Sequence, residues 1–391
     1  MTRNNHISIR QLLIGACTAG ALLFTSACAQ NSTFGSGTSG ESSSSSVAIA
    51  VMYPETGQYA EYGKMFKQGL DLGVKQVNAD GGVQGKKLEL KYFDTQSDPK
   101  QTAAIAPKIA ADKSVVAVVG DYSSGASMAA SPTFQQAKLV HYGFNNSASD
   151  FTSTGDYVWT PQFSQAVFQK QNAELVAQKA KKIAAVYIEN DWGKSAYAEF
   201  KKEAKELGIS IVYESSYLAD STDLSPILIP ARDAKPDAVV HIGYGPDGAL
   251  VVNTLRDKLG YTGLFYGGQI TQEYIKLSGS NGEGTRLIGP FTPDSTNPNA
   301  AKFVKAFRAA YKTDPGEFNQ TSYASIIDLA YGMNKTSATR EGVEKALKTV
   351  DDFPCYVGTK TTFKFNQSTR RMDSTSFLKL ELTDGKFQIT D

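Results

Sequence analysis

The fold is constrained most by short apolar runs that alternate with amphipathic stretches and start a second round near the middle of the chain. Residues 47–52, 115–119 and 238–242 are rich in valine, alanine and isoleucine, which is typical of strands buried on both faces of a sheet. Residues 66–77 carry apolar side chains at three- and four-residue spacing, which predicts a helix. Strands that alternate with helices predict an α/β fold with parallel sheets, and two rounds predict two sheets.

Each round supplies strands and the helices between them. We expect first-round strands at 47–52, 88–93, 115–119 and 139–142, with helices at 66–77, after Asp98-Pro99 and at 126–137. We expect second-round strands at 183–188, 209–213, 238–242 and 264–266, with helices at 168–180, 195–207, 224–233 and 247–259. The end of the chain predicts helices at 299–311, 322–334 and 341–349 and strands at 360–365, 376–382 and 387–389.

The first 27 residues have the layout of a secretory signal. Arg3 and Arg10 precede a run of small and apolar residues, and no acidic residue interrupts it. Cys28 follows directly, as in bacterial lipoprotein signals, in which that cysteine becomes the lipid attachment site. A membrane-spanning anchor is the alternative, but the apolar stretch is too short to cross hydrocarbon comfortably. Residues 28–46 are mostly serine, glycine and threonine, and we expect a flexible tether there.

The composition of the remaining part, about 345 residues, excludes several kinds of partner. Without Arg3 and Arg10 the formal charge changes from +1 to −1, so no basic excess points to nucleic acid. Cys355 is the only cysteine after Cys28, so we expect no internal disulfide, and three scattered histidines argue against a metal site. Neither a glycine motif for nucleotide phosphates nor a nucleophile–histidine pair stands out. We therefore expect no cofactor and no enzyme activity.

Hydroxyl, amide and aromatic side chains gather where four predicted strands end. These segments are 54–63, 120–127, 144–149 and 189–193. In open parallel sheets, ligands bind beyond the carboxyl ends of the strands. Ser124 and Ser147 lie where we expect helices to begin, so their hydroxyls and the free backbone N–H groups would bind a carboxylate without a full positive charge. The alternative is that each serine only caps its helix.

Several short motifs occur in a specific order. They are Thr56-Gly57, 60–63 (AEYG), 77–85 (VNADGGVQG), Asp94 with 97–101 (SDPKQ), Gly120 with Ser123-Ser124, 144–148 (FNNSA), Trp192-Gly193 and 243–246 (GYGP). On these motifs, nearly all of the chain after Val47 resembles the periplasmic branched-chain amino-acid-binding proteins, the solute receptors of leucine/isoleucine/valine-type ABC importers. The resemblance implies the type I periplasmic binding protein fold, in which two doubly wound parallel-sheet lobes are joined by three crossovers and close on a solute.

The resemblance also implies how the chain is divided and what it binds. The amino-terminal lobe would hold 47–161 plus 291–360, and the carboxy-terminal lobe 162–290 plus 361–391. The protein would be a monomeric, lipid-anchored receptor in the cell envelope, periplasmic or on the outer face of the cytoplasmic membrane. Its partners would be a small carboxylate solute, such as an amino acid or related acid or amide, and an ABC permease that recognises the closed form. The alternative is an envelope lipoprotein of the same fold that acts as a sensor or protein-interaction module.

Eight positions match the solute-contacting residues of the family. They are Tyr62, Ser124, Asn145, Asn146, Ser147, Trp192, Tyr244 and Gln269. By resemblance, the two serines hold the solute carboxylate, the two asparagines offer backbone groups to the solute head, and the aromatic residues form walls of the cleft. Ser97 and Ser123 stand where some members have a disulfide, so we expect that bridge to be missing.

Gln269 departs from the family pattern. Amino-acid-binding members carry a glutamate there that pairs with the ligand ammonium, and a neutral glutamine cannot form that charge-assisted bond. A neighbouring carboxylate could replace it, and the candidates are Glu55, Asp121, Glu189, Asp191 and Asp247. Otherwise the solute would be a carboxylate or amide without a free amine, with apolar faces supplied by Tyr59, Tyr62, Tyr122, Phe144, Trp192 and Tyr244.

Overall fold

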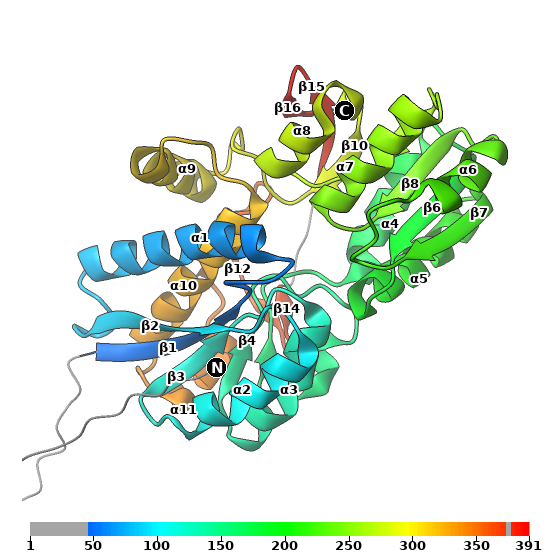
Figure 1. Ribbon diagram of the computed structural model, residues 1–391. Helices are drawn as coiled ribbons and strands as arrows, with labels where there is room; N and C mark the ends of the chain where they lie inside the picture. The colour runs from blue at the N-terminus through cyan, green and yellow to red at the C-terminus, as the bar shows by residue number, and fades with distance from the viewer. Residues whose placement is uncertain (1–45, 373–376, 391) are drawn as a thin grey trace, which may run out of the picture. The chain divides into compact units, whose positions relative to one another are not determined.

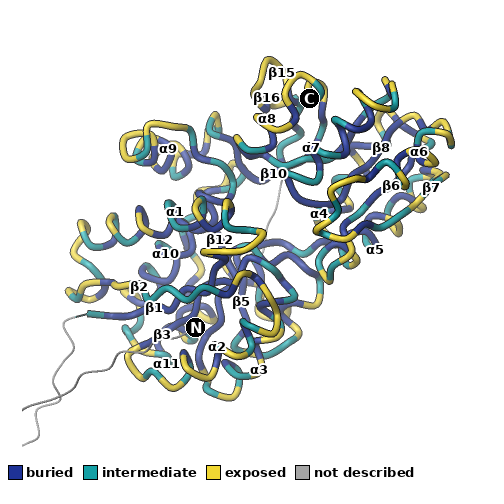
Figure 2. The backbone as a smooth tube through the Cα atoms, viewed as in Figure 1, coloured by how far each residue is buried: buried dark blue, intermediate teal, exposed yellow. Residues whose placement is uncertain are grey.

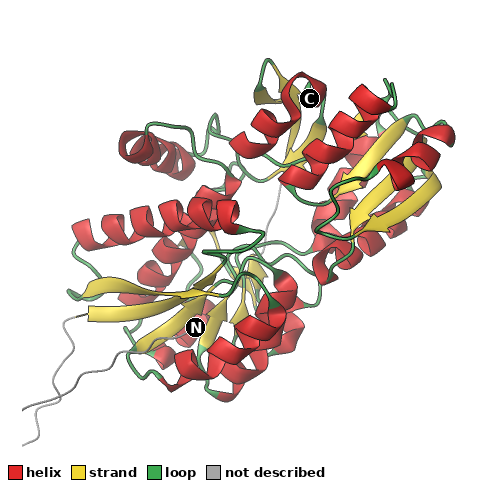
Figure 3. Cartoon of the chain, viewed as in Figure 1, coloured by secondary structure: helices red, strands yellow, loops and turns green. Residues whose placement is uncertain are grey.

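Two large sheets organise the part of the chain that the computed structural model describes, residues 46–372 and 377–390 (Figure 1). Figure 3 shows helices beside the strands of both sheets, as the alternating pattern predicts. The predicted signal at 1–27, the lipid site at Cys28 and nearly all of the tether lie outside the described residues. Ser46, which we assigned to the tether, is instead the first residue of strand β1.

The first sheet has five parallel strands in the order β2-β1-β3-β4-β5. They are β1 (Ser46–Tyr53), β2 (Lys87–Asp94), β3 (Val115–Val119), β4 (Val140–Tyr142) and β5 (Val158–Trp159). Helices α1 (Ala60–Ala79), α2 (Pro99–Ala111) and α3 (Ser124–Gln136) connect the strands, and the 3₁₀ turn η1 (Phe151–Thr154) precedes β5.

Strand β1 is buried on both faces because helices cover each of them. Its residues Val47, Ile49 and Val51 share a core with α1, whereas its intervening residues share a second core with α2 and α3. Figure 2 shows the resulting dark blue strands beneath more exposed helix surfaces. This two-sided burial explains why the strand reads as a continuous apolar run rather than an alternating one.

The second sheet has seven strands in the order β16-β15-β10-β9-β8-β6-β7, antiparallel only at β15 and β16. They are β6 (Lys182–Ile188), β7 (Ser210–Tyr217), β8 (Ala238–Ile242), β9 (Leu264–Tyr266), β10 (Arg286–Gly289), β15 (Leu378–Thr383) and β16 (Lys386–Ile389). The helices are α4 (Gln165–Ala177), α5 (Asp191–Glu206), α6 (Ser225–Asp233), α7 (Gly245–Asn253) with a π turn (Thr254–Lys258), α8 (Gln272–Ser278) and the 3₁₀ turn η3 (Gly279–Gly282).

The segment between β10 and β15 returns to the first sheet. It contains α9 (Pro298–Tyr311), α10 (Glu317–Lys335), α11 (Arg340–Thr349) and the short strands β11 (Phe353–Pro354), β12 (Thr362–Phe363), β13 (Phe365–Asn366) and β14 (Arg371–Met372). Helix α10 packs along α1, and α11 contacts β3 and β4. The chain therefore crosses between the two sheets three times, which confirms the predicted fold class. The lobe boundaries expected from the resemblance stay a prediction.

The sequence predictions missed some elements and misplaced the start of others. Strands β5 and β10 and helix α8 were not predicted. Helix α10 begins at Glu317, five residues before the predicted start, and its first turn is closed by Asn319 Oδ1, which accepts from Gly316 N at 2.9 Å. The expectation of a helix at Ser147 is wrong, because a loop follows β4 there. Within 46–372 and 377–390, no helix combines the length and apolar character required to cross a membrane.

Candidate functional site

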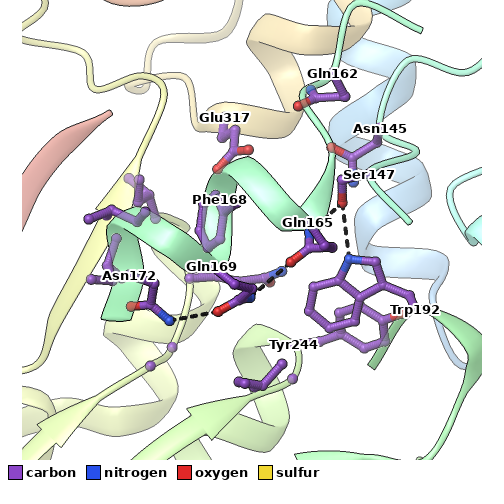
Figure 4. Close-up of a pocket in the computed structure, with 18 of the residues that line it drawn as sticks. Asn145, Ser147, Gln162, Gln165, Phe168, Gln169, Asn172, Trp192, Tyr244 and Glu317 are labelled. Atoms are coloured by element: carbon purple, nitrogen blue, oxygen red, sulfur yellow. Dashed lines mark hydrogen bonds between the residues drawn. The ribbon is translucent and has the colours of Figure 1, made fainter. Parts of the chain in front are cut away.

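A cavity of about 130 Å³ lies between the carboxyl ends of the first-sheet strands and residues of the second sheet. The segments that follow β3 and β4 contribute Tyr122, Ser124, Asn145 and Ser147, and the start of α10 contributes Glu317 and Phe318. The opposite wall comes from α4, from Trp192, from the β8–α7 turn and from 267–270. Figure 4 shows this convergence, with α4 side chains running across the cavity toward Ser147 and Trp192.

The structure brings six of the eight predicted site residues to this cavity. They are Ser124, Asn145, Ser147, Trp192, Tyr244 and Gln269. Tyr62 lies behind this layer, 2% exposed, and Asn146 is fully buried with its Nδ2 donating to Ser127 Oγ at 3.1 Å. Of the other predicted aromatic contacts, Tyr122 lines the cavity, whereas Tyr59 and Phe144 do not. Solute contact by these residues stays a prediction.

Ser147 is held in a fixed hydrogen-bonding role. Its Oγ accepts from Gln165 Nε2 at 2.7 Å and from Trp192 Nε1 at 3.0 Å. A hydroxyl oxygen has two lone pairs, so both acceptor positions are used and only the O–H proton remains. The Ser147 hydroxyl can therefore donate a hydrogen bond to a group in the cavity, such as an anion or a carbonyl oxygen.

Ser124 offers a second hydroxyl from the first turn of α3. Its Oγ is buried and has no hydrogen-bond partner among the described residues. The N-cap of α3 is Ser123, whose Oγ accepts from Ala126 N at 3.4 Å. Capping is thus done by the neighbouring serine, which leaves Ser124 free to donate to a group in the cavity. Leaving a buried hydroxyl unpaired costs roughly 1–3 kcal/mol, a cost that a bound acceptor removes.

Arg371 fixes the loop that carries Ser147, and sequence reasoning missed it. The residue is 4% exposed, and Nη1 donates to the carbonyl oxygens of Asn146 (3.2 Å), Gln162 (3.3 Å) and Phe163 (3.4 Å). Nη2 donates to the carbonyl oxygen of Ala148. Burial lowers the pKa of Arg371 to about 10, so it remains charged at neutral pH. One side chain therefore ties both flanks of Ser147 to the crossover that leads into α4.

The Gln269 side chain forms hydrogen bonds with residues packed on both sheets, Tyr62 and Gly245. Its Oε1 accepts from Gly245 N at 2.8 Å and from the Tyr62 hydroxyl at 3.1 Å. Burial raises the pKa of Tyr62 well above its usual value, so this phenol keeps its proton and donates. Trp192 stacks on Tyr244 nearby, with ring centroids 5.2 Å apart.

None of the five carboxylates proposed to replace the family glutamate lines the cavity. Asp121 is fully buried among Thr95, Ser97 and backbone N–H groups, and burial raises its pKa. Asp247 accepts from Tyr217 Oη and Tyr244 N, and burial raises its pKa to about 6. Glu55, Glu189 and Asp191 are exposed. Their expected role as an ammonium partner is not supported by these positions.

Glu317 is the one carboxylate among the described residues that lines the cavity, and the sequence analysis did not identify it. It was missed because α10 was predicted to start at Ser322, although Pro315-Gly316 marks a helix boundary. Burial raises the pKa of Glu317 to about 7. Among the described residues, no lysine or arginine lines the cavity, and no group of three or more His, Cys, Asp or Glu side chains could hold a metal.

We expect the Glu317→Gln variant without solute to be more stable than the wild type at pH 8, by roughly 2 kcal/mol. The folded pKa of about 7 lies above the usual 4.5, so ionised Glu317 destabilises the folded protein. This cost is complete above pH 7 and absent below about pH 4.5. Urea unfolding at pH 8 and pH 4.5 measures it, and the gain should vanish at the lower pH. The exposed Glu89→Gln is the control, and an equal gain there would contradict the assignment.

The model of the periplasmic binding protein family matches residues 46–379, which is most of the chain. The protein therefore belongs to the periplasmic binding protein family. Its members are solute-binding proteins of the cell envelope, not enzymes, in agreement with the sequence analysis.

The relatives agree with this family. Leu/Ile/Val-binding protein homolog 1 of Brucella melitensis is 28% identical over 329 residues, which cover 82% of this chain and 86% of the relative. The solved structure of a branched-chain amino acid transporter substrate binding protein from Streptococcus pneumoniae, in complex with isoleucine, has a TM-score of 0.79 at 24% identity and covers 88% of this chain and 98% of that one. An ABC transporter solute binding protein from Rhodopseudomonas palustris, in complex with 3,4-dihydroxybenzoic acid, has a TM-score of 0.77 at 21% identity, with coverages of 88% and 95%. The structural likeness establishes the fold.

Proposed function

We propose that this protein is the solute receptor of an ABC importer and that it binds a small carboxylate between its two sheets. The observation that supports this most directly is the hydrogen bonding of the two serines, Ser124 and Ser147. Ser147 has both acceptor positions occupied, and Ser124 has a buried hydroxyl without a partner, so both offer protons to the same cavity. Two converging neutral donors suit a carboxylate, which has several acceptor positions.

Hydrogen bonds across the cleft support a role for closure. Gln58 Nε2 donates to the carbonyl oxygen of Ala219 at 2.5 Å, and Ser149 contacts Ser195 and Glu199 at 3.3 and 3.2 Å. Together with the Trp192–Ser147 bond, these contacts exist only when the two sheets are close. A solute that bridges the serines and the second-sheet wall would favour this state, which a permease could then recognise.

The chemical class of the solute is wider than branched-chain amino acids. The two structural relatives hold isoleucine in one case and an aromatic acid without an amine in the other, and a carboxylate is common to both. Gln269 in this chain lacks the charge of the family glutamate, so the carboxylate is the feature of the solute that the cavity recognises first.

We further propose that Cys28 carries a lipid and that the Ser/Gly-rich residues 28–45 connect it to the folded part. A flexible tether of this composition allows the receptor to remain near the membrane and to reach its permease. The proposal rests on the signal-like residues 1–27, the cysteine that follows them and the envelope location of the family. Labelling of cells with radioactive fatty acid and its loss in Cys28→Ala would test the attachment.

Ser124→Ala and Ser147→Ala are each expected to weaken solute binding by roughly 1.5–3 kcal/mol, because each removes a hydrogen bond to a charged group. Native mass spectrometry of the protein purified without refolding would identify the solute, and calorimetry would measure its affinity. Ser325→Ala is the matched control, since its buried hydroxyl donates to Thr321 O within α10 and does not line the cavity. Wild-type affinity in both cavity variants would contradict the proposed site.

A further inference from the structure

Three side-chain amides along α4 form a hydrogen-bonded row that ends at Ser147. Asn172 Nδ2 donates to Gln169 Oε1 at 3.0 Å, Gln169 Nε2 donates to Gln165 Oε1 at 2.8 Å, and Gln165 Nε2 donates to Ser147 Oγ at 2.7 Å. The dashed lines in Figure 4 follow this row. From Gln165 to Asn172 it spans about 10 Å along the helix, at 1.5 Å per residue.

The row has a direction. Every N–H in it points toward Ser147, and the last amide, Asn172, is left with its carbonyl oxygen as an acceptor. Hydrogen bonds in such a chain polarise one another. The Ser147 end therefore favours an anion or acceptor, whereas the Asn172 end favours a donor or a cation.

Glu317 adds a negative charge to the same cavity. No hydrogen bond or ion pair of its carboxylate is found among the described residues, and Figure 4 shows it projecting toward Phe168 of α4 rather than toward Trp192. The part of the lining that the structure describes contains no lysine or arginine, and burial lowers the pKa of its one histidine, His241, to about 3. A solute with only a carboxylate would thus meet a second carboxylate and no positive side chain.

We propose that Glu317 binds a cationic nitrogen of the solute, so that the solute is a carboxylate with an ammonium or guanidinium group several bonds away from it. This inference rests on the proposed carboxylate site at Ser124 and Ser147 and specifies the class of solute. The cation neutralises a partly buried carboxylate that faces the cavity without a positively charged partner among the described lining residues. The proposal also explains why a neutral Gln269 is tolerated, because Glu317 supplies a negative charge at another wall of the same cavity.

Matched pairs of solutes test the proposal. We would measure affinities by calorimetry on the full chain for 5-aminopentanoate against pentanoate, lysine against norleucine, and arginine against citrulline. Within each pair the carboxylate is the same and only the distant cation differs. We expect the cationic member of at least one pair to bind the wild type at least tenfold more tightly than its neutral partner. Glu317→Gln should remove that preference.

Glu273→Gln provides the matched control, because Glu273 is a half-buried carboxylate of α8 that does not line the cavity. It should leave the preference for cationic solutes unchanged, whereas Ser147→Ala should weaken binding of both members of a pair. Equal binding of the partners in every pair, or a preference that survives Glu317→Gln, would overturn the cation subsite. If carboxylates bind in a Ser147-dependent way without that preference, the proposed function stands and this inference fails. Absence of binding by every carboxylate tested would count against both.

Discussion

Replacement of Arg371 by methionine is expected to lower the free energy of unfolding by roughly 3–5 kcal/mol, because several buried polar groups lose their hydrogen-bond partner. Methionine preserves much of the apolar stem but donates no hydrogen bonds. The carbonyl oxygens of Asn146, Ala148, Gln162 and Phe163 would then lose the donor that Arg371 gives them. Urea unfolding monitored by fluorescence and circular dichroism measures the loss.

Arg371→Lys and Arg308→Met separate the causes of this loss. Lysine retains the charge but cannot reach four carbonyl groups with a planar fork, so we expect an intermediate loss. Arg308 is half exposed and pairs only with Asp314, so its replacement should cost less than about 1 kcal/mol. A loss for Arg371→Met no larger than that of Arg308→Met would show that the buried guanidinium does not hold the Ser147 loop. If it does hold the loop, solute affinity should also fall in Arg371→Lys, which keeps more of the fold.

The sequence predicted the parts of the site that follow from sheet geometry. Ser124 and Ser147 come after neighbouring parallel strands, β3 and β4, whose carboxyl ends meet at one edge. Their convergence could therefore be expected before the structure was known. The alternating apolar runs likewise fixed the two sheets, because burial on both faces leaves a clear signature in the residues.

Other parts of the site could not be predicted because they depend on contacts between distant segments. Arg371 lies more than 200 residues from the loop it holds, and its guanidinium donates to backbone oxygens, which no residue type encodes. Glu317 enters the cavity because α10 starts earlier than its apolar pattern suggests. The unpaired state of Ser124 depends on Ser123 taking the capping position, and two adjacent serines give no sequence signal that distinguishes their roles.

The spacing of α1 and α10 is a further feature that matters to the site. Tyr62, which supports Gln269, lies on α1, and Glu317 opens α10. The helices are in close contact at Gly69, where an added Cβ would lie 2.1 Å from Ser322 Oγ and 2.2 Å from Asn319 O. A contact this short with a backbone oxygen cannot be relieved by a side-chain rotation alone, so the helices must separate.

Gly69→Ala is accordingly expected to destabilise the protein by roughly 3 kcal/mol or more, through overpacking at a buried helix contact. Helix propensity alone would have the opposite effect, because at an open position alanine stabilises a helix by about 1 kcal/mol relative to glycine. Gly73→Ala, whose Cβ would meet the Ile326 side chain at 2.9 Å, should cost less, and the exposed Lys75→Ala should cost almost nothing. A Gly69→Ala variant as stable as Lys75→Ala in urea would mean that α1 and α10 are not held this close. Since separation of the helices moves Tyr62 and Glu317 apart, the same variant should also lose solute affinity at temperatures where it remains folded.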